Sequence, residues 1–173
     1  LFTGEGPQQH PQAAFINPSL PPSYPIVEKF TKWDAHWYTY IAQNGYNAKS
    51  IVFFPLLPLM IRLAAPLFGF DFGLAGFVLC NIFGVASFVI MYRLFRVDFS
   101  EEVSNRALLA YALIPSSIFL HTVYTEPIFL TLAMFSIYNA RLGNWFAAGI
   151  FAALASLTRN IGVFLTLIIL YEY

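Results

Sequence analysis

Long apolar runs separated by short polar stretches dominate the chain after residue 70. The run from Asp71 to Phe95 carries no charge between Asp71 and Arg93. About 20 apolar residues suffice to cross a bilayer, so this run predicts a membrane-spanning helix. Two further runs, Ala107–Val123 and Ile128–Ala140, predict additional crossings. The expected fold class is therefore an all-α polytopic membrane protein.

The last part of this pattern is ambiguous. Two shorter apolar pieces, Phe146–Leu157 and Ile161–Tyr173, flank the polar stretch around Arg159. Either the chain breaks at Arg159, or one long helix carries this arginine inside it, and the sequence leaves both open. The sequence also stops within an apolar run and lacks an initiator Met. We therefore expect an N-terminal part of a larger domain, with at least one helix before Leu1 and several after Tyr173.

The first 70 residues have a different pattern. Residues 1–28 are rich in Pro, Gln and Gly, which predicts an extended extramembrane segment. A short helix at the membrane surface is expected over Glu28–Asn44. The stretch Ile51–Phe70 is apolar but contains three prolines and Arg62. An arginine at mid-bilayer costs at least ~2.5 kcal/mol, so we predict a juxtamembrane or re-entrant helix; the alternative is a Pro-kinked span with Arg62 snorkelling.

Composition agrees with a membrane protein. The chain is 58% hydrophobic and 10% charged, with a mean hydropathy of +0.65, whereas soluble domains carry about 25% charged residues. Net charge is zero, which argues against nucleic acid as a partner. The single cysteine, Cys80, lies in an apolar run and is expected to be a packing residue.

The arginines predict how the helices are oriented. Arg93, Arg96 and Arg106 surround one polar loop, and Arg141 opens another short turn. By the positive-inside rule, both loops face the cytoplasm. The Tyr124–Pro127 turn then lies on the opposite side, together with the stretch around Asp34, two crossings away.

The stretch from Lys32 to Ala42 is the most polar and aromatic part of the chain, and Asp34 is its one carboxylate. Trp and Tyr side chains favour the membrane–water interface. The stretch is therefore interpreted as a surface helix that presents an acid. The alternative is an interfacial anchor in which Asp34 only begins the helix.

Four motifs in order carry a family resemblance. The first is Trp33-Asp34-Ala35-x-Trp37-Tyr38-x-x-Ile41-Ala42-x-x-Gly45-Tyr46, and the second is Phe53-Phe54-Pro55-Leu56-x-Pro58-Leu59-x-x-Arg62. The third is Tyr124-Thr125-Glu126-Pro127-Ile128-Phe129-Leu130, and the fourth is Ala155-Ser156-Leu157-Thr158-Arg159-Asn160-Ile161-Gly162. From about Trp33 onward the chain resembles the PIG-V-like mannosyltransferases of the GT-C class, in a form closer to the bacterial members.

The resemblance implies a fold and an activity. Residues 1–173 would form the N-terminal part of one GT-C-like helix bundle. Within it, 1–28 would be extramembrane, 29–70 a first outer loop with juxtamembrane helices, and 71–173 transmembrane helices. The implied reaction moves a sugar, expected to be mannose, from a polyprenyl-phosphate donor to a glycan or glycolipid acceptor, with inversion, on the non-cytoplasmic side. A transporter or flippase, or a non-catalytic scaffold of the same architecture, is the competing interpretation. Charges that cluster at one surface rather than line a path favour the enzyme.

Candidate site residues follow from this resemblance and from side-chain chemistry. Asp34 would be the general base. Arg159 is the first choice for the donor phosphate and Arg62 the second, because a guanidinium binds two phosphate oxygens. The remaining expected substrate-binding residues are His36, Glu126, Trp33, Trp37 and Tyr38.

Each of the polar candidates also has a structural interpretation. Glu126 could be a helix-entry acid before Pro127, Arg159 a buried ion-pair partner of an acid in the part of the protein beyond Tyr173, and His36 an interfacial histidine. No Cys/His cluster is present, so the sequence gives no support for a divalent metal. The expected partners are the lipid-linked donor, the acceptor and membrane lipids. The expected location is the bacterial plasma (inner) membrane, or the endoplasmic reticulum membrane in a eukaryote.

Overall fold

The computed structural model describes residues 25–30 and 33–173, and every regular element in this part of the chain is a helix. Most of the segment expected to be extended, residues 1–24, lies outside the described residues. From Pro25 onward that expectation is wrong, because Pro25–Phe30 forms helix α1. Proline suits the first position of a helix, where its missing N–H leaves no bond unmade.

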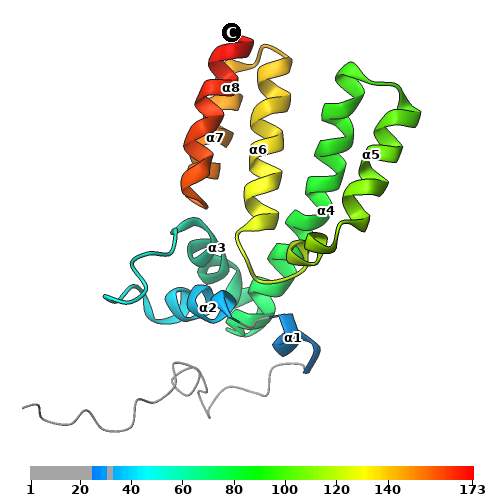
Figure 1. Cartoon of the computed structure of the whole chain (residues 1–173). Helices are drawn as coiled ribbons and strands as arrows, with labels where there is room; N and C mark the ends of the chain where they lie inside the picture. The colour runs from blue at the N-terminus through cyan, green and yellow to red at the C-terminus, as the bar shows by residue number, and fades with distance from the viewer. Residues whose placement is uncertain (1–24, 31–32) are drawn as a thin grey trace, which may run out of the picture.

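Two short helices lie across one end of the molecule (Figure 1). Helix α2 spans Asp34–Asn44, so it begins six residues later than the predicted start at Glu28. Helix α3, Leu56–Ala64, continues into the 3-10 helix η2, Ala65–Phe68. Their combined length is below that of a bilayer-crossing helix, and whether Ile51–Phe70 crosses the membrane stays a prediction.

Helix α4, Phe72–Asp98, is the longest described element, with 27 residues. Asp71 caps it, because its carboxylate accepts the Leu74 N–H at 2.8 Å. Among the described residues, α4 is the one helix long and apolar enough to cross a membrane by length and composition. Only 39% of its most apolar stretch is buried within the protein, so the prediction of a spanning helix here is supported.

The next predicted crossing, Ala107–Val123, differs from the structure. Helix α5 spans Glu101–Leu113, capped by Ser100, and the 3-10 helix η3 covers Pro115–Leu120. The run Ala107–Val123 was expected to form one crossing, but Pro115 lies within it. Instead α5 ends before it, because a residue preceding proline disfavours the helical region, and Ile114 is extended at φ −65°, ψ 131°.

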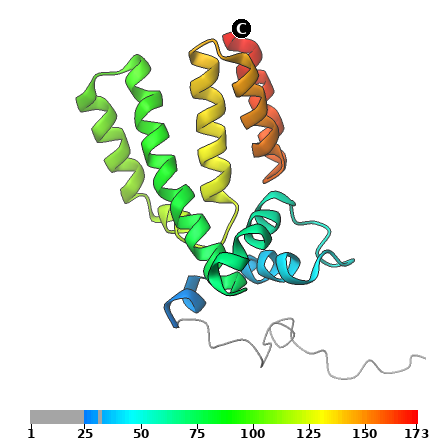
Figure 2. The ribbon, with the colours of Figure 1, turned by 180° about the vertical axis from the view of Figure 1, so that it is seen from behind.

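The remaining helices are α6, Glu126–Arg141; α7, Trp145–Ser156; the 3-10 helix η4, Asn160–Phe164; and α8, Leu165–Glu172. Both views show α4 and α5 as one antiparallel pair and α7 and α8 as another, with α6 between them (Figures 1 and 2). The chain therefore breaks near Arg159, which decides between the two alternatives that the sequence left open.

The core forms where α2 and α3 meet the ends of α4, α6 and α7. Its fully buried members include Ala35, Leu57, Ile61, Ala75, Cys80, Val123, Ile128 and Ala155. The outer faces of the long helices are apolar as well. Exposed side chains there include Val85, Val89, Leu109, Leu113, Phe146, Leu167 and Leu170. So much exposed apolar surface is typical of a protein that contacts lipid.

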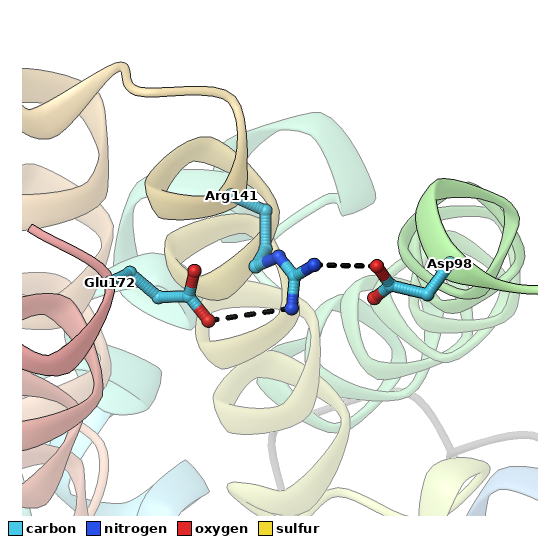
Figure 3. A network of polar contacts seen from close by, with 3 residues as sticks. All are labelled: Asp98, Arg141 and Glu172. Atoms are coloured by element: carbon cyan, nitrogen blue, oxygen red, sulfur yellow. Dashed lines mark hydrogen bonds and ion pairs between the residues drawn. The ribbon is translucent and has the colours of Figure 1, made fainter.

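The opposite end of the bundle is held by a polar network (Figure 3). Arg141, the last residue of α6, contacts Asp98 of α4 at 2.5 Å and Glu172 of α8 at 3.4 Å. One guanidinium thus joins the ends of three helices, far from α2 and α3. Elsewhere in the bundle, His121 and Asn81 form a side-chain hydrogen bond at 2.9 Å.

Gly162 controls the break between α7 and η4. A Cβ there would lie 2.5 Å from the Ser156 backbone nitrogen and 2.7 Å from the Ala155 carbonyl carbon. We predict that Gly162→Ala destabilises the protein by about 1–3 kcal/mol, because backbone atoms must move apart. Thermal unfolding in detergent measures this. Gly149→Ala is the matched control, since a Cβ there meets nothing within 4 Å; an equal loss in both variants would contradict the prediction.

Candidate functional site

Asp34 is the first residue of α2 and its side chain is exposed to solvent. Tyr38 follows one turn later, so both side chains lie on the same face of the helix. The residue before them, Trp33, has φ 56° and ψ −123°. Non-glycine residues rarely adopt such a backbone, and outliers of this kind concentrate at functional sites. Asp34 is therefore presented from a strained turn.

Glu126 and Arg159 form an ion pair beside this face. Arg159 Nη1 lies 2.5 Å from Glu126 Oε1, and the two side chains are 40% and 30% exposed. Glu126 opens α6 and Arg159 sits in the break after α7. The pair thus joins two helix ends that are 33 residues apart in sequence, and it remains partly accessible from outside.

The local structure fixes where Arg159 lies. The buried Thr158 donates its hydroxyl to the Ala155 carbonyl at 2.6 Å, which closes the end of α7. The Leu56 N–H donates to the Leu157 carbonyl at 3.1 Å, which ties the break to the start of α3. The close approach of Gly162 completes the turn. Arg159 is therefore held by backbone contacts on both sides.

Tyr38 links helix α2 to the start of helix α6. Its side chain is 8% exposed and hydrogen-bonds the side chain of Thr125. Burial raises the pKa of Tyr38 to about 12; the charges of Asp34 and Glu126 add to this, while the Thr125 bond and Arg159 oppose it. The phenol is therefore neutral at ordinary pH and lies among two carboxylates and one guanidinium.

The ion pair leaves bonding capacity unused. Arg159 contacts Glu126 through one nitrogen, and its other guanidinium nitrogens bond no side chain or carbonyl in the described part of the protein. Glu126 Oε2 is buried and has no hydrogen-bond partner among the described residues. Buried unsatisfied oxygens are rare and call for an explanation such as a function or an absent partner. A guanidinium with free donors is suited to an oxyanion such as phosphate.

The predicted site residues divide into two groups. Asp34, Tyr38, Glu126 and Arg159 form one group, since the charges of the other three residues shift the pKa of the Tyr38 phenol. Trp37 and Tyr38 both pack against Phe53, at ring distances of 5.7 and 5.2 Å.

The other candidates differ in how exposed they are. The Trp33 side chain is 74% exposed, and His36 is partly buried on α2. Arg62 lies on the exposed side of α3 and forms no ion pair with a described residue. No three His, Cys, Asp or Glu side chains in the described ranges are placed to hold a metal ion.

Two residues of the cluster had no role in the sequence-based prediction. The Thr125 side chain lowers the pKa of the Tyr38 phenol, and the Asp34 backbone lowers the pKa of the Tyr124 phenol. Both belong to the motif that contains Glu126, and their place in this motif was the sequence feature that could have indicated a role for them. Their contacts are with α2, more than 80 positions earlier, so spacing alone did not indicate them.

Comparison with known proteins identifies the family. The family model "Mannosyltransferase (PIG-V)" matches residues 23–171. The chain therefore belongs to the PIG-V mannosyltransferase family, a family of glycosyltransferases, which confirms the resemblance seen in the motifs.

Two curated relatives are similar over 172 residues. They are the mouse and rat proteins named GPI alpha-1,6-mannosyltransferase 2, which are 24% and 26% identical to this chain. The match covers 89% of this chain and 35% of each relative, so the chain spans about a third of their length. No solved structure matches the chain.

The pKa of Tyr38 predicts a pH effect on stability. The folded-state pKa is about 12 and the ordinary value is 10.0. Tyr38 therefore contributes its full stability below pH 10, and this contribution is lost as pH rises towards 12, because the unfolded chain loses the proton first. Wild type should lose more thermal stability between pH 10 and pH 12 than Tyr38→Phe. Parallel curves for the two proteins would contradict this assignment.

Proposed function

We propose that this chain forms part of the active site of a polytopic, GT-C-like membrane mannosyltransferase. The donor is polyprenyl-phosphate mannose, and the acceptor is a hydroxyl of a glycan or glycolipid. Transfer takes place on the non-cytoplasmic side of the membrane, with inversion at the anomeric carbon. The observation that carries the proposal is the cluster of Asp34, Tyr38, Glu126 and Arg159 at one end of an apolar bundle, in a chain of the PIG-V family.

A lipid-linked donor suits the position of this cluster. The helices that carry it have apolar outer faces, and α2 and α3 lie across the same end of the bundle. Soluble nucleotide sugars are cytoplasmic, whereas the arginine-rich loops at the other end are predicted to face the cytoplasm. A sugar that is attached to a lipid phosphate is held in the membrane, so it can reach a site at the non-cytoplasmic surface. The proposed location is the plasma membrane of a bacterium or the endoplasmic reticulum membrane of a eukaryote.

Asp34 acts as the general base in this proposal. Its carboxylate removes the proton from the acceptor hydroxyl as the acceptor oxygen bonds to the anomeric carbon. The bond from that carbon to the phosphate oxygen breaks, and the phosphate leaves with the electron pair. Because attack and departure occur on opposite faces of the sugar, a single displacement inverts the configuration. A positioned base contributes typically ~10²–10⁴-fold to the rate.

Arg159 binds the phosphate and stabilises the charge that develops on it. Its free N–H groups point to this role, and Glu126 holds the guanidinium from the other side. Tyr38, protonated at ordinary pH, is a hydrogen-bond donor between the base and the ion pair. The aromatic side chains of Trp33 and Trp37 provide surface for the sugar or lipid. His36 and Arg62 are the outlying members of the proposed substrate surface.

The first prediction from this proposal concerns Asp34. In the intact natural protein, Asp34→Asn should lower mannosyl transfer by at least ~100-fold, because the amide cannot accept the proton. Donor binding should survive, since the phosphate is bound by Arg159. Asp34→Glu should also be impaired, because one methylene displaces the carboxylate. Transfer from polyprenyl-phosphate mannose in nanodiscs measures all three proteins.

Asp71→Asn is the matched control for this experiment. Asp71 caps α4 through its carboxylate, and asparagine caps helices about as well as aspartate, so this variant should keep wild-type transfer. If Asp34 served only to begin α2, Asp34→Asn would behave in the same way. Near-wild-type transfer by Asp34→Asn would therefore exclude Asp34 as the base.

A second prediction concerns Arg159. Arg159→Lys keeps the charge and the attraction to Glu126 but loses the planar guanidinium, so affinity for polyprenyl phosphate should fall by about ten-fold. Arg93→Lys, at an exposed position in the last two turns of α4, should leave this affinity unchanged. Binding of polyprenyl phosphate to each purified protein provides the measurement. Unchanged affinity in Arg159→Ala, with folding intact, would leave Arg159 a purely structural ion-pair partner.

A further inference from the structure

The loop between α2 and α3, residues 45–55, carries two large apolar side chains at its tip. Ile51 is 74% exposed and Val52 is 72% exposed. Both views show this loop extending away from the bundle, at the end of the molecule where α2 and α3 lie (Figures 1 and 2). Contact of neighbouring aliphatic side chains with water is unfavourable, so the tip requires either a flexible loop that hides it or a partner that covers it.

The loop is held in place before the tip by the side chain of Asn47. Its Oδ1 accepts the Lys49 N–H at 2.9 Å and the Ser50 N–H at 3.0 Å. The Asn47 N–H in turn donates to the Ser50 hydroxyl oxygen at 2.8 Å, and Ser50 is 0% exposed. An asparagine that bonds the backbone two and three residues further on stabilises a tight turn. Ser50 is therefore fixed on the inside of the loop, directly before Ile51.

The loop is also held after the tip. The Phe53 ring stacks on Trp37 of α2 with ring centroids 5.7 Å apart, and the Phe53 carbonyl accepts the Tyr46 hydroxyl at 3.0 Å. The Asn47 amide donates to the Tyr40 hydroxyl at 3.2 Å, which ties the turn to α2 as well. The two tip residues lie between these anchored positions, so they cannot fold back onto α2 without breaking the contacts. A partner must therefore cover them.

The charges near the tip indicate the chemistry of this partner. The sequence has no Asp or Glu between Asp34 and Asp71, whereas it has Lys49 and Arg62. Lys49 is exposed and lies two residues before Ile51. Neither cation forms an ion pair with a described residue. A cation beside exposed aliphatic side chains suits the boundary of a bilayer, where anionic phosphates lie next to acyl chains.

Helix α3 continues the same pattern. Leu57 and Ile61 are 0% exposed, whereas Leu59 and Leu63 are 51% and 71% exposed. Residues three and four apart share a helix face, so Arg62 lies on the same exposed face as Leu59 and Leu63. The combination of aliphatic side chains with an unpaired cation thus occurs on two consecutive elements. This favours an extended apolar and anionic surface over a single small ligand as the partner.

We propose that the loop inserts Ile51 and Val52 into the headgroup layer of the non-cytoplasmic leaflet, with Lys49 bonded to the phosphate of an anionic phospholipid. Because the loop is bonded to α2 through Tyr40 and stacked on it through Phe53, this contact fixes the depth of α2 in the membrane. The depth of Asp34, which begins α2, is fixed with it. The inference rests on the membrane orientation in the proposed function and does not depend on the transfer reaction.

A spin label at position 51 tests the insertion. Ile51→Cys is introduced into the intact natural protein, with other accessible cysteines replaced, and labelled in nanodiscs of equal parts phosphatidylcholine and phosphatidylglycerol. Collisions with oxygen, which concentrates in the bilayer, are compared with collisions with a neutral nickel chelate, which stays in water. The oxygen-to-nickel ratio should be several-fold higher than for a label at Gln43→Cys, an exposed polar position of α2.

Lys49→Gln tests the phosphate contact. One cation near an anionic membrane surface changes the binding equilibrium by about five-fold, so in these nanodiscs the oxygen-to-nickel ratio at position 51 should fall by about that factor. In nanodiscs of phosphatidylcholine alone, the variant and its parent should give equal ratios. Lys29→Gln, at an exposed lysine of α1, is the matched control and should leave the ratio at position 51 unchanged.

Three outcomes would overturn the inference. Collisions mainly with nickel at position 51 would place the tip in water. Protection from both reagents would show that protein covers the tip, either another part of the chain or a second copy. Equal ratios with and without the Lys49→Gln change in anionic nanodiscs would remove the phosphate contact.

A label at Val85→Cys separates this inference from the proposed function. Val85 lies in α4 and is 62% exposed, so a membrane-spanning α4 predicts collisions mainly with oxygen there. Collisions mainly with nickel at position 85 would overturn the membrane placement on which the proposed function depends. Oxygen collisions at position 85 together with nickel collisions at position 51 would overturn the loop insertion alone.

Discussion

The ion pair between Glu126 and Arg159 is the contact on which the arrangement of the site depends. It joins the start of α6 to the break after α7, and these two points lie 33 residues apart in sequence. Both charges are partly shielded from water, and leaving either without the other would be costly. The pair also places a guanidinium with unused donors beside the face of α2 that carries Asp34 and Tyr38. The backbone contacts of Leu157 and Gly162 fix the position of the break between α7 and η4, and therefore the position of Arg159.

An arginine forms an ion pair with carboxylates at each end of the bundle, but the two arginines differ in how many of their donors are bonded. At one end Arg141 is bonded on both sides, by Asp98 and Glu172, so its guanidinium is engaged with protein (Figure 3). At the other end Arg159 has a single carboxylate partner whose second oxygen is itself unsatisfied. The first arrangement is that of a structural tie between helices. The second leaves donors for a ligand, and the ligand that we propose for them is the phosphate of a lipid-linked sugar.

Much of the helical architecture could be predicted from the sequence, because apolar length and capping residues act locally. The long helix α4 follows from its uncharged run, and Ser100 is a favourable residue to cap α5. The end of α5 was misjudged because proline signals either a kink or a stop, and the backbone of Ile114 decides between them. The break at Arg159 could not be predicted, since both flanking runs are short and apolar. The partner of Arg159 is Glu126, and this pairing depends on how α6 and α7 pack together.

A structure of the intact natural protein, determined by electron cryo-microscopy with a non-transferable phosphonate analogue of polyprenyl-phosphate mannose, tests the central claim most directly. The account predicts phosphonate oxygens at hydrogen-bonding distance, about 2.7–3.2 Å, from the guanidinium of Arg159. The free face of the anomeric carbon should be turned towards Asp34, with room for an acceptor hydroxyl between them. A phosphonate bound at the Arg141 end of the bundle, or bound at this end without contact to Arg159, would contradict the account.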